Sequence, residues 1–312
     1  MLKVQNISFS YQSDITLKSI SFSVKKGNTL AVIGESGCGK STLLKLIYGL
    51  HDLDEGQIFW NEKEVLGPKY HLIPGMEFMK YLAQDFDLMP YITVAENVGK
   101  YLSNFYPVPK KERIAELLEI VEMTEYANVK AQFLSGGQMQ RVAIARVLAL
   151  EPEVLLLDEP FSHIDNFRKN SLRRKLFQYL KEKEITTIVA THDSTDVLSF
   201  ADEVYIMQSG TIIESGLPQS IYNSPINKYV ASLFDDVNEI ILKGKTYFVF
   251  PHQLKIVEQS DIKVRVKKAY FRGNHYLVEA DFNGIPLFFQ SAEVISEGVL
   301  LCLSFEESSL KF

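Results

Sequence analysis

Apolar residues recur along the first 235 positions in two spacings, one typical of strands and the other of helices. Alternating apolar and polar residues over Val4–Ser10 and Ile20–Val24 predict two strands that are buried on one face. Continuous apolar runs predict strands that are buried on both faces. These runs are Thr29–Ile33, Val154–Leu157 and Thr186–Ala190, and a hairpin is predicted from Val204–Gln208 and Thr211–Glu214.

Helical signals lie between these strands. Thr93 followed by Glu96 forms a capping box, which predicts that a helix begins there. Lys110–Val121 carries apolar residues three and four positions apart, the spacing of an amphipathic helix. Ser135 is expected to cap a helix over Met139–Leu150. Further helices are predicted at Asn166–Lys183 and Ile221–Phe234.

The pattern changes near Asp235. From Ile240 onward the chain shows short β-rich runs separated by turns such as Phe282-Asn-Gly284, which predicts a small β-barrel or sandwich. We therefore predict an α/β domain over residues 1–235, with an inserted helical subdomain at about 85–134. An all-β domain is predicted over residues 236–312.

Composition places few further limits on the chain. It has 312 residues, 46% of them hydrophobic and 23% charged, which is typical of a globular protein with two domains. The net charge of -6 provides no general attraction to nucleic acid. Cys38 and Cys302 are far apart in sequence, so a disulfide framework is not expected. No apolar run approaches the roughly 18 residues of a membrane span, so a membrane role would require a partner.

One glycine-rich stretch carries the strongest chemical signal. It runs from Gly34 to Thr42 (GESGCGKST), after the apolar strand Thr29–Ile33 and before an apolar segment with helical spacing. Strand, glycine-rich loop and helix are the context of a P-loop, whose backbone N–H groups surround a phosphate chain. Lys40 would contact the β- and γ-phosphates, and the Ser41 hydroxyl would ligate Mg²⁺.

Other polar groups follow the predicted strands and helices. Asp158 and Glu159 end a buried strand, and ligands bind at this end of the strands in such sheets. Asp158 fits the carboxylate on the magnesium side, and Glu159 fits the group that polarises water. His192 ends another strand and could reach a γ-phosphate. Ser135-Gly-Gly137 opens a helix and forms a second candidate anion site. Taken singly, these residues could also be solvated acids, a structural histidine and an ordinary helix cap.

Tyr11 ends the first predicted strand. It is either a half-buried aromatic residue, as is common in strands, or a stacking platform for a nucleobase. The residue alone favours the former interpretation.

Together these residues resemble the ATP-binding subunit of an ABC transporter over nearly the whole chain. The matching motifs are Walker A (Gly34, Glu35, Ser36, Gly37, Cys38, Gly39, Lys40, Ser41, Thr42), the Q-loop (Gln84), the signature (Leu134–Gln138), Walker B (Val154–Glu159), the D-loop (Ser162–Asp165) and the H-loop (His192). Tyr11 matches the A-loop aromatic, which reverses the preference stated above.

The resemblance also indicates which type of ABC transporter the subunit would serve. Asp158–Asp165 (DEPFSHID) and Gly216–Pro225 (GLPQSIYNSP) are similar to importer sequences, and Ile240–Phe312 resembles the OB-like TOBE domain of iron(III), polyamine and sulfate uptake systems. Glu35 and Ile164 depart from the usual importer residues, and neither lies at a phosphate-binding position. The expected fold is a P-loop NTPase core with an inserted helical subdomain, followed by the TOBE-like domain.

The resemblance implies a head-to-tail dimer with two ATPs and Mg²⁺ at its interface. One subunit would supply Walker A, Walker B with Asp158 and Glu159, Gln84 and His192, and the other Ser135, Gly137 and Gln138. Tyr11 and Asp165 would be further nucleotide-binding residues. Ser41, Gln84 and Asp158 would hold the metal. The partners would be a membrane permease and a solute-binding protein, at the cytoplasmic face of the inner membrane, with no nucleic acid involved.

Alternatives are an exporter-type ATPase and a non-transport ABC ATPase. Glu35 slightly favours the exporter, whereas the TOBE-like tail argues against it. OB-like folds can bind oligonucleotides, but the tail lacks a basic stripe with aromatic residues. The sequence does not name the solute.

We expect the coupling helix of a permease to contact a groove that includes Asp85–Tyr91.

Overall fold

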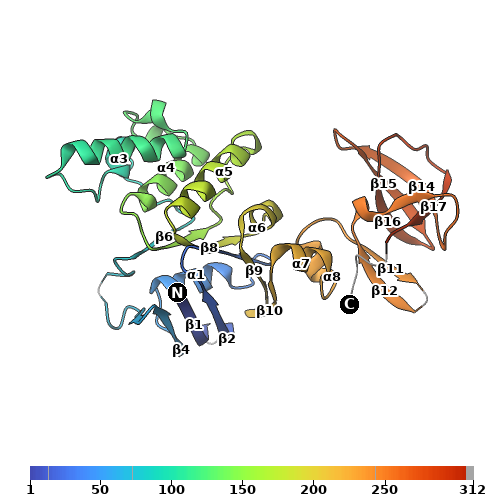
Figure 1. The fold of residues 1–312 in the computed structure, drawn as a ribbon, viewed down its shortest axis with the longest axis horizontal. Helices are drawn as coiled ribbons and strands as arrows, with labels where there is room; N and C mark the ends of the chain where they lie inside the picture. Colours follow the sequence, from blue (N-terminus) through green and yellow to red (C-terminus); the bar gives the residue numbers. More distant parts are fainter. Residues whose placement is uncertain (13, 72, 243, 307–312) are drawn as a thin grey trace. The chain divides into compact units, whose positions relative to one another are not determined.

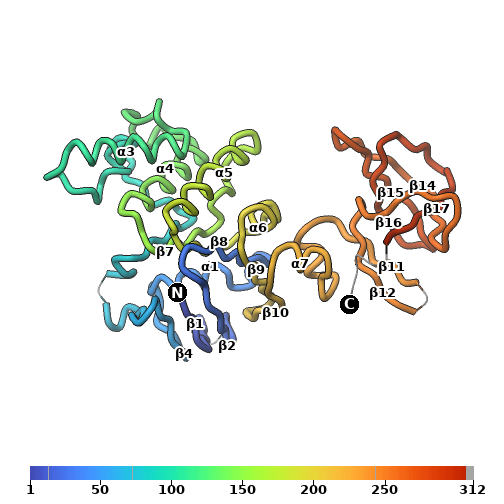
Figure 2. Tube along the Cα trace, in the orientation of Figure 1, coloured from blue at the N-terminus to red at the C-terminus, as the bar shows by residue number. Residues whose placement is uncertain are grey.

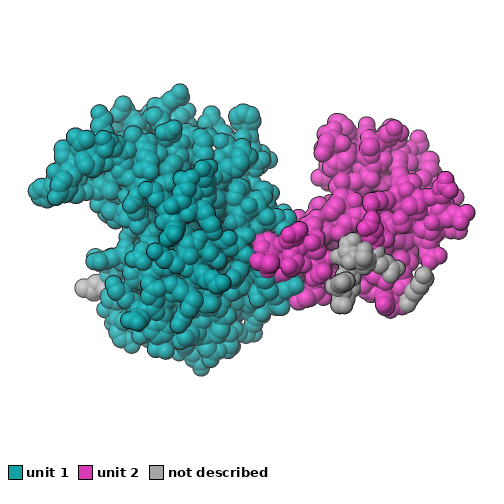
Figure 3. All heavy atoms as spheres, in the orientation of Figure 1, with its two compact units in different colours: residues 1–216 teal, residues 217–312 magenta. Residues whose placement is uncertain are grey.

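The structure is a computed structural model, and it describes residues 1–12, 14–71, 73–242 and 244–306. The chain divides into two compact units, residues 1–216 and 217–312, which are coloured separately in Figure 3. We predicted the domain boundary at residue 235. The division into compact units falls after Gly216. The functional assignment of residues 1–235 and 236–312 to two domains stays a prediction.

The first unit is built on a six-stranded sheet, visible with its helices in Figure 1. Five of its strands are parallel and β10 is antiparallel at one edge. In spatial order the strands are β10 (Thr211–Gly216), β9 (Glu203–Gln208), β3 (Thr29–Ile33), β8 (Thr186–Thr191), β7 (Val154–Asp158) and β6 (Met79–Leu82).

The two faces of this sheet are covered by different elements, because successive side chains of a strand point to opposite faces. On β7, Leu156 packs into a core with helix α1 (Lys40–Tyr48). A four-stranded antiparallel sheet covers the same core. Its strands are β2 (Asp14–Val24), β1 (Leu2–Tyr11), β4 (Glu55–Trp60) and β5 (Lys63–Glu64).

On the opposite face, Leu155 and Leu157 of β7 join a second core, which contains residues of the helical segment. Figure 2 traces this segment in cyan and green between β6 and β7. The helices on this face are α2 (Val94–Val98), α3 (Pro107–Ile120), α4 (Gly136–Leu148) and α5 (Asn166–Glu182), with short 3₁₀ turns at Thr124–Tyr126 and Ala131–Phe133. Helix α6 (Ser194–Phe200) follows β8.

The predicted capping box of Thr93 and the predicted cap Ser135 are both present in the structure. Thr93 caps α2, where its side chain accepts from Glu96 N and the Glu96 carboxylate accepts from Thr93 N at 2.7 Å. Ser135 caps α4 in the same way, with Gln138 as its reciprocal partner. Thr93 and Ser135 are therefore helix caps as predicted, but α4 begins at Gly136 and not at the predicted Met139, because its first turn includes both glycines of the signature.

The second unit contains an antiparallel five-stranded sheet and a separate hairpin around one apolar core. In spatial order the sheet has strands β13 (Lys255–Val257), β17 (Leu300–Ser304), β14 (Ile262–Phe271), β15 (Tyr276–Phe282) and β16 (Ile285–Ser291). The hairpin joins β11 (Asn238–Leu242) to β12 (Lys245–Val249), and a 3₁₀ turn lies at Pro251–Gln253.

One helix prediction was wrong in its extent. Residues 221–234 do not form one helix but parts of two short ones, α7 (Pro218–Asn223) and α8 (Lys228–Ser232). Pro225 explains the interruption, since proline disfavours helical backbone at the residue before it and cannot donate a helical hydrogen bond. Asn227 then caps α8 by accepting from Val230 N at 2.9 Å.

Candidate nucleotide-binding site

Sheet topology brings the main predicted site residues together. Strands β6, β7, β8 and β3 are consecutive parallel neighbours, so their carboxyl ends meet at one edge of the sheet. The P-loop follows β3, and Gln84 lies two residues beyond β6. Glu159 follows β7 directly and His192 follows β8 directly. Four segments that are distant in sequence thereby converge.

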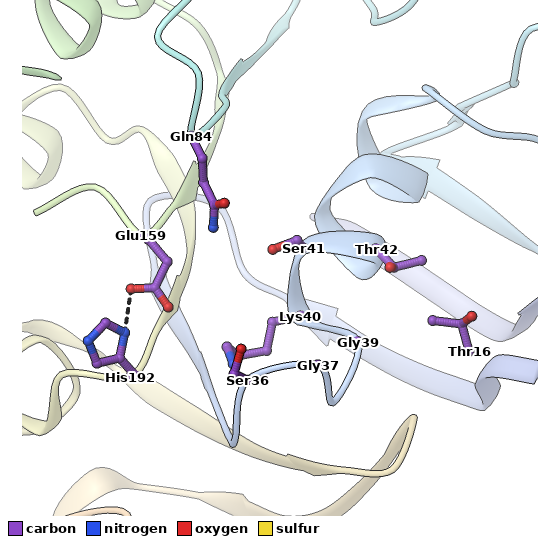
Figure 4. Close-up of a pocket in the computed structure, with 10 residues that line it drawn as sticks. All are labelled: Thr16, Ser36, Gly37, Gly39, Lys40, Ser41, Thr42, Gln84, Glu159 and His192. Atoms are coloured by element: carbon purple, nitrogen blue, oxygen red, sulfur yellow. Dashed lines mark ion pairs between the residues drawn. The ribbon is translucent and has the colours of Figure 1, made fainter. Parts of the chain in front are cut away.

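A cavity of about 450 Å³ lies at this edge (Figure 4). Most of its lining was predicted from the sequence, and Thr16 of β2 was not. The lining residues are Thr16, Ser36, Gly37, Gly39, Lys40, Ser41, Thr42, Gln84, Glu159 and His192.

The P-loop places a positive charge inside a backbone cradle. Lys40 is buried, and its Nζ donates to the carbonyl oxygens of Gly34 at 2.7 Å and Glu35 at 2.9 Å. Gly39, in the left-handed conformation at φ 109°, is the N-cap of α1 and offers no side-chain cap. The first N–H groups of the helix are therefore left for a ligand, and the arrangement suits a chain of phosphates.

Asp158 is buried beside this cradle with both carboxylate oxygens engaged. Ser41 Oγ donates to Oδ1 at 2.9 Å and the Tyr81 hydroxyl donates to Oδ2 at 3.1 Å. Burial raises the pKa of Asp158, and the two hydrogen bonds oppose that shift because they stabilise the ionised form.

These groups fit a hard divalent cation. Ser41, Asp158 and Gln84 offer hydroxyl, carboxylate and amide oxygens, the ligand types that Mg²⁺ prefers. Within the described residues, no group of three or more His, Cys, Asp or Glu side chains could hold a metal ion. A cation here would therefore depend on the phosphates of a bound nucleotide and on water for part of its coordination.

Glu159 and His192 form a close pair. Their Oε2 and Nδ1 atoms are 2.6 Å apart, and Figure 4 shows both side chains facing the cavity that Lys40 and Ser41 line. Glu159 adopts a left-handed backbone conformation with φ 51°. Its N–H donates to the carbonyl of Ala190 at 2.9 Å, and its own carbonyl accepts from Gln140 Nε2 at 2.9 Å. Strained residues held by their surroundings are typical of functional sites.

The signature residues occupy a different position. Ser135 is exposed at the start of α4, and a Cβ built on Gly137 would lie 2.6 Å from the carbonyl oxygen of His163 in the D-loop. The signature and the D-loop of one chain are therefore adjacent. Across the described part of the chain, Ser135, Gly137, Gln138 and Asp165 are not among the residues that line the cavity.

Tyr11 packs in an aromatic group beside α1. Its ring lies 4.8 Å from that of Phe9 and 5.5 Å from that of His51, and its hydroxyl is 3.3 Å from His51 Nε2. The side chain is 41% exposed, which leaves part of the ring accessible. Its role as a base platform stays a prediction.

Comparison with known proteins identifies the family. A sequence model described as ABC transporter matches residues 17–162. The chain is 42% identical over 240 residues to the Fe(3+) ions import ATP-binding protein FbpC 1 of Rhodococcus jostii, covering 75% of this chain and 67% of that protein. It is 32% identical over 306 residues to the spermidine/putrescine import ATP-binding protein PotA of Acetivibrio thermocellus, covering 88% and 86% of the two chains. The chain belongs to the ATP-binding subunits of ABC transporters.

Solved structures agree with this assignment. The dimeric post-hydrolysis structure of the ATP-binding cassette MJ0796 with ADP and Pi has a TM-score of 0.62 and 28% identity, covering 70% of this chain and 99% of that chain. The cbiO1 subunit of Clostridium perfringens has a TM-score of 0.62 and 30% identity, covering 71% and 90%. The predicted ABC ATPase fold, ATP hydrolase activity and importer-type subunit are therefore confirmed.

Proposed function

We propose that this ABC ATPase hydrolyses Mg-ATP in sites shared between two copies of the chain and energises solute uptake through a membrane permease. The observation that carries the proposal is the division of the predicted site. The P-loop, Gln84, Glu159 and His192 line one cavity, while the signature residues lie outside its lining. A second copy, arranged head to tail, would place Ser135 and Gly137 against the exposed side of the nucleotide.

The charge distribution of ATP gives a physical reason for this arrangement. The P-loop and the start of α1 surround the phosphates from one side only. The N-terminus of a second helix, α4 of the other copy, would neutralise charge on the γ-phosphate from the opposite side. Bound nucleotide would then stabilise the dimer, and hydrolysis would weaken it.

Five residues in or beside the cavity would take part in metal binding and hydrolysis. Mg²⁺, held by Ser41, Asp158 and Gln84, would withdraw charge from the phosphates. Glu159 would accept the proton of the attacking water. His192, already 2.6 Å from Glu159, would orient this carboxylate and donate toward the γ-phosphate.

Partner assignments follow from the family and remain proposals. Within the described residues, the longest apolar helices fall short of what a membrane crossing requires. The permease would contact the segment Asp85–Tyr91, where Met89 and Tyr91 are 41% and 75% exposed. The expected place is the cytoplasmic face of the inner membrane, with a solute-binding protein as a further partner. Two relatives named for different solutes, Fe(3+) and spermidine/putrescine, leave the solute of this chain unassigned.

Light scattering on Glu159→Gln tests the shared site, because this variant should retain ATP without hydrolysing it. We expect a shift from monomer to dimer on addition of Mg-ATP. Ser135→Arg in the same background should abolish the shift by placing bulk and charge at the start of α4. Ser220→Arg, on an exposed position of α7, is the matched control and should leave the shift intact. An absent shift, or one that survives Ser135→Arg, contradicts the shared site.

A further inference from the structure

A tyrosine that no sequence motif includes contacts the metal-side carboxylate. Tyr81 lies on β6, directly opposite Leu156 of the neighbouring strand β7. Its hydroxyl donates to Asp158 Oδ2 at 3.1 Å, two residues beyond that register position. The ring packs against Tyr48 of α1 at a centroid distance of 5.6 Å, so its position is fixed from the helix side as well.

Asp158 is held in this orientation by two donors on different elements. Ser41 Oγ, at the start of α1, donates to Oδ1 of Asp158, and the Tyr81 hydroxyl, on β6, donates to Oδ2. A hydroxyl has lone pairs in addition to its proton, so Ser41 can ligate a cation and still donate to Asp158. Both hydrogen bonds are therefore compatible with a bound cation, and Tyr81 is the donor that is not itself proposed as a metal ligand.

The second donor matters because the aspartate side chain is otherwise free to turn. Rotation of a carboxylate about χ2 is broad and roughly two-fold, so a single hydrogen bond leaves its plane poorly defined. With one donor on each oxygen, the plane of Asp158 is set by α1 and β6 together. Outer partners that fix the orientation of a metal-binding carboxylate strengthen metal binding.

We propose that Tyr81 is a positioning residue for the magnesium site, in which it holds Asp158 in the orientation that receives the metal of Mg-ATP. The proposal rests on the magnesium use proposed above. It assigns Tyr81 no contact with nucleotide or water and no part in proton transfer. The competing explanation is that the hydroxyl merely satisfies a buried tyrosine, and it predicts no effect on metal affinity.

Burial and charge support the contact. The pKa of Tyr81 is raised strongly, first by burial and then by the adjacent Asp158 charge. The protonated phenol is the form that donates to Asp158 Oδ2.

The test compares Tyr81→Phe with Tyr48→Phe. Each variant loses one hydroxyl from one of two neighbouring rings, but only Tyr81 donates to Asp158. Binding of a fluorescent ATP analogue is measured in EDTA and across a Mg²⁺ titration, and Mn²⁺ binding to the ATP complex is followed by electron paramagnetic resonance. We expect Tyr81→Phe to raise the half-saturating metal concentration about tenfold, with affinity in EDTA unchanged within about twofold. Tyr48→Phe should leave both values unchanged.

A double variant distinguishes positioning of Asp158 from a general loss of packing around the site. If Tyr81 acts through Asp158, adding Tyr81→Phe to Asp158→Asn should not raise the metal requirement further. An equal shift in Tyr48→Phe, a shift below about twofold in Tyr81→Phe, or additive effects in the double variant would overturn the proposal. If nucleotide binding by the unaltered protein shows no metal dependence, the proposed magnesium use fails first, and the role of Tyr81 fails with it.

Discussion

Gln140 offers a direct test of how the position of Glu159 is maintained. This α4 residue is 2% exposed and joins the helix to the segment after β7 by three hydrogen bonds. Its Nε2 donates to the carbonyl of Glu159 at 2.9 Å and to Ser162 Oγ at 3.3 Å, and its Oε1 accepts from His163 N at 3.0 Å. Gln140→Ala removes all three bonds and leaves a space in a packed region.

The size of the effect can be estimated from these contacts. Each lost bond contributes about 1 kcal/mol, so Gln140→Ala should lower the free energy of unfolding by about 3 kcal/mol. For a unit of this size, that loss corresponds to a fall in Tm of roughly 6–12 °C. Glu159 would also lose the contact that supports its left-handed backbone, and displacement by about 1 Å can reduce turnover roughly 100-fold.

Thermal unfolding and steady-state ATPase assays on the purified chain measure both effects. Gln178→Ala is the control, because this exposed α5 glutamine makes one hydrogen bond, to Glu182 at 2.8 Å. It should change stability by less than about 0.5 kcal/mol and leave turnover unaltered. The reasoning is refuted if Gln140→Ala keeps turnover within about twofold and Tm within about 1 °C of the parent protein.

Two further predictions concern packing and charge. Gly34→Ala should reduce the affinity for a fluorescent ATP analogue at least about tenfold. The reason is that the new Cβ would lie 2.2 Å from the carbonyl oxygen of Met207 and must displace the P-loop. An affinity within about twofold of the parent protein would contradict this prediction. Asp196 is buried beside Arg173, and burial raises the pKa of Asp196 from 3.8 to about 6. The folded state therefore binds this proton more tightly than the unfolded state does. The stability gained from the bound proton is lost as the pH rises from about 4 to 6. Relative to Asp196→Asn, the parent protein should therefore gain about 2 kcal/mol between pH 7.5 and pH 4.5 in urea unfolding, and a constant difference would show that Asp196 titrates normally.

Signals confined to a few neighbouring residues were interpreted correctly from the sequence. The P-loop, the capping box of Thr93 and Glu96, and the buried strands depend on local spacing, and each lies where it was predicted. Pro225 was an equally local signal that the prediction of one helix over 221–234 overlooked.

Features created by distant pairing could not be predicted in this way. Strand β6 has four residues and no clear alternation, and its conformation depends on pairing with β7. Tyr81 meets Asp158 across 77 positions, and Gln140 meets Glu159 across 19. Thr16 enters the cavity lining because β2 lies beside the P-loop, where the Thr16 carbonyl oxygen would be 3.3 Å from a Cβ built on Gly39. These contacts depend on sheet order, which no single segment specifies.

Helix α4 shows why strand ends alone do not define the site. It begins at the signature, contacts Glu159 through Gln140, and near its end binds the loop after Gln84 through Arg146, whose guanidinium donates to Asp87 Oδ2 at 2.8 Å. Asp87 has a left-handed backbone conformation, as has Phe86 before it, and each costs about 1–2 kcal/mol without support. A displacement of this 13-residue helix must therefore strain the bonds to Glu159 or to the Gln84 loop. The helix whose first turn would face the nucleotide of a second copy thus also contacts Glu159 and the segment that follows Gln84, the two residues of its own chain that we propose act in hydrolysis.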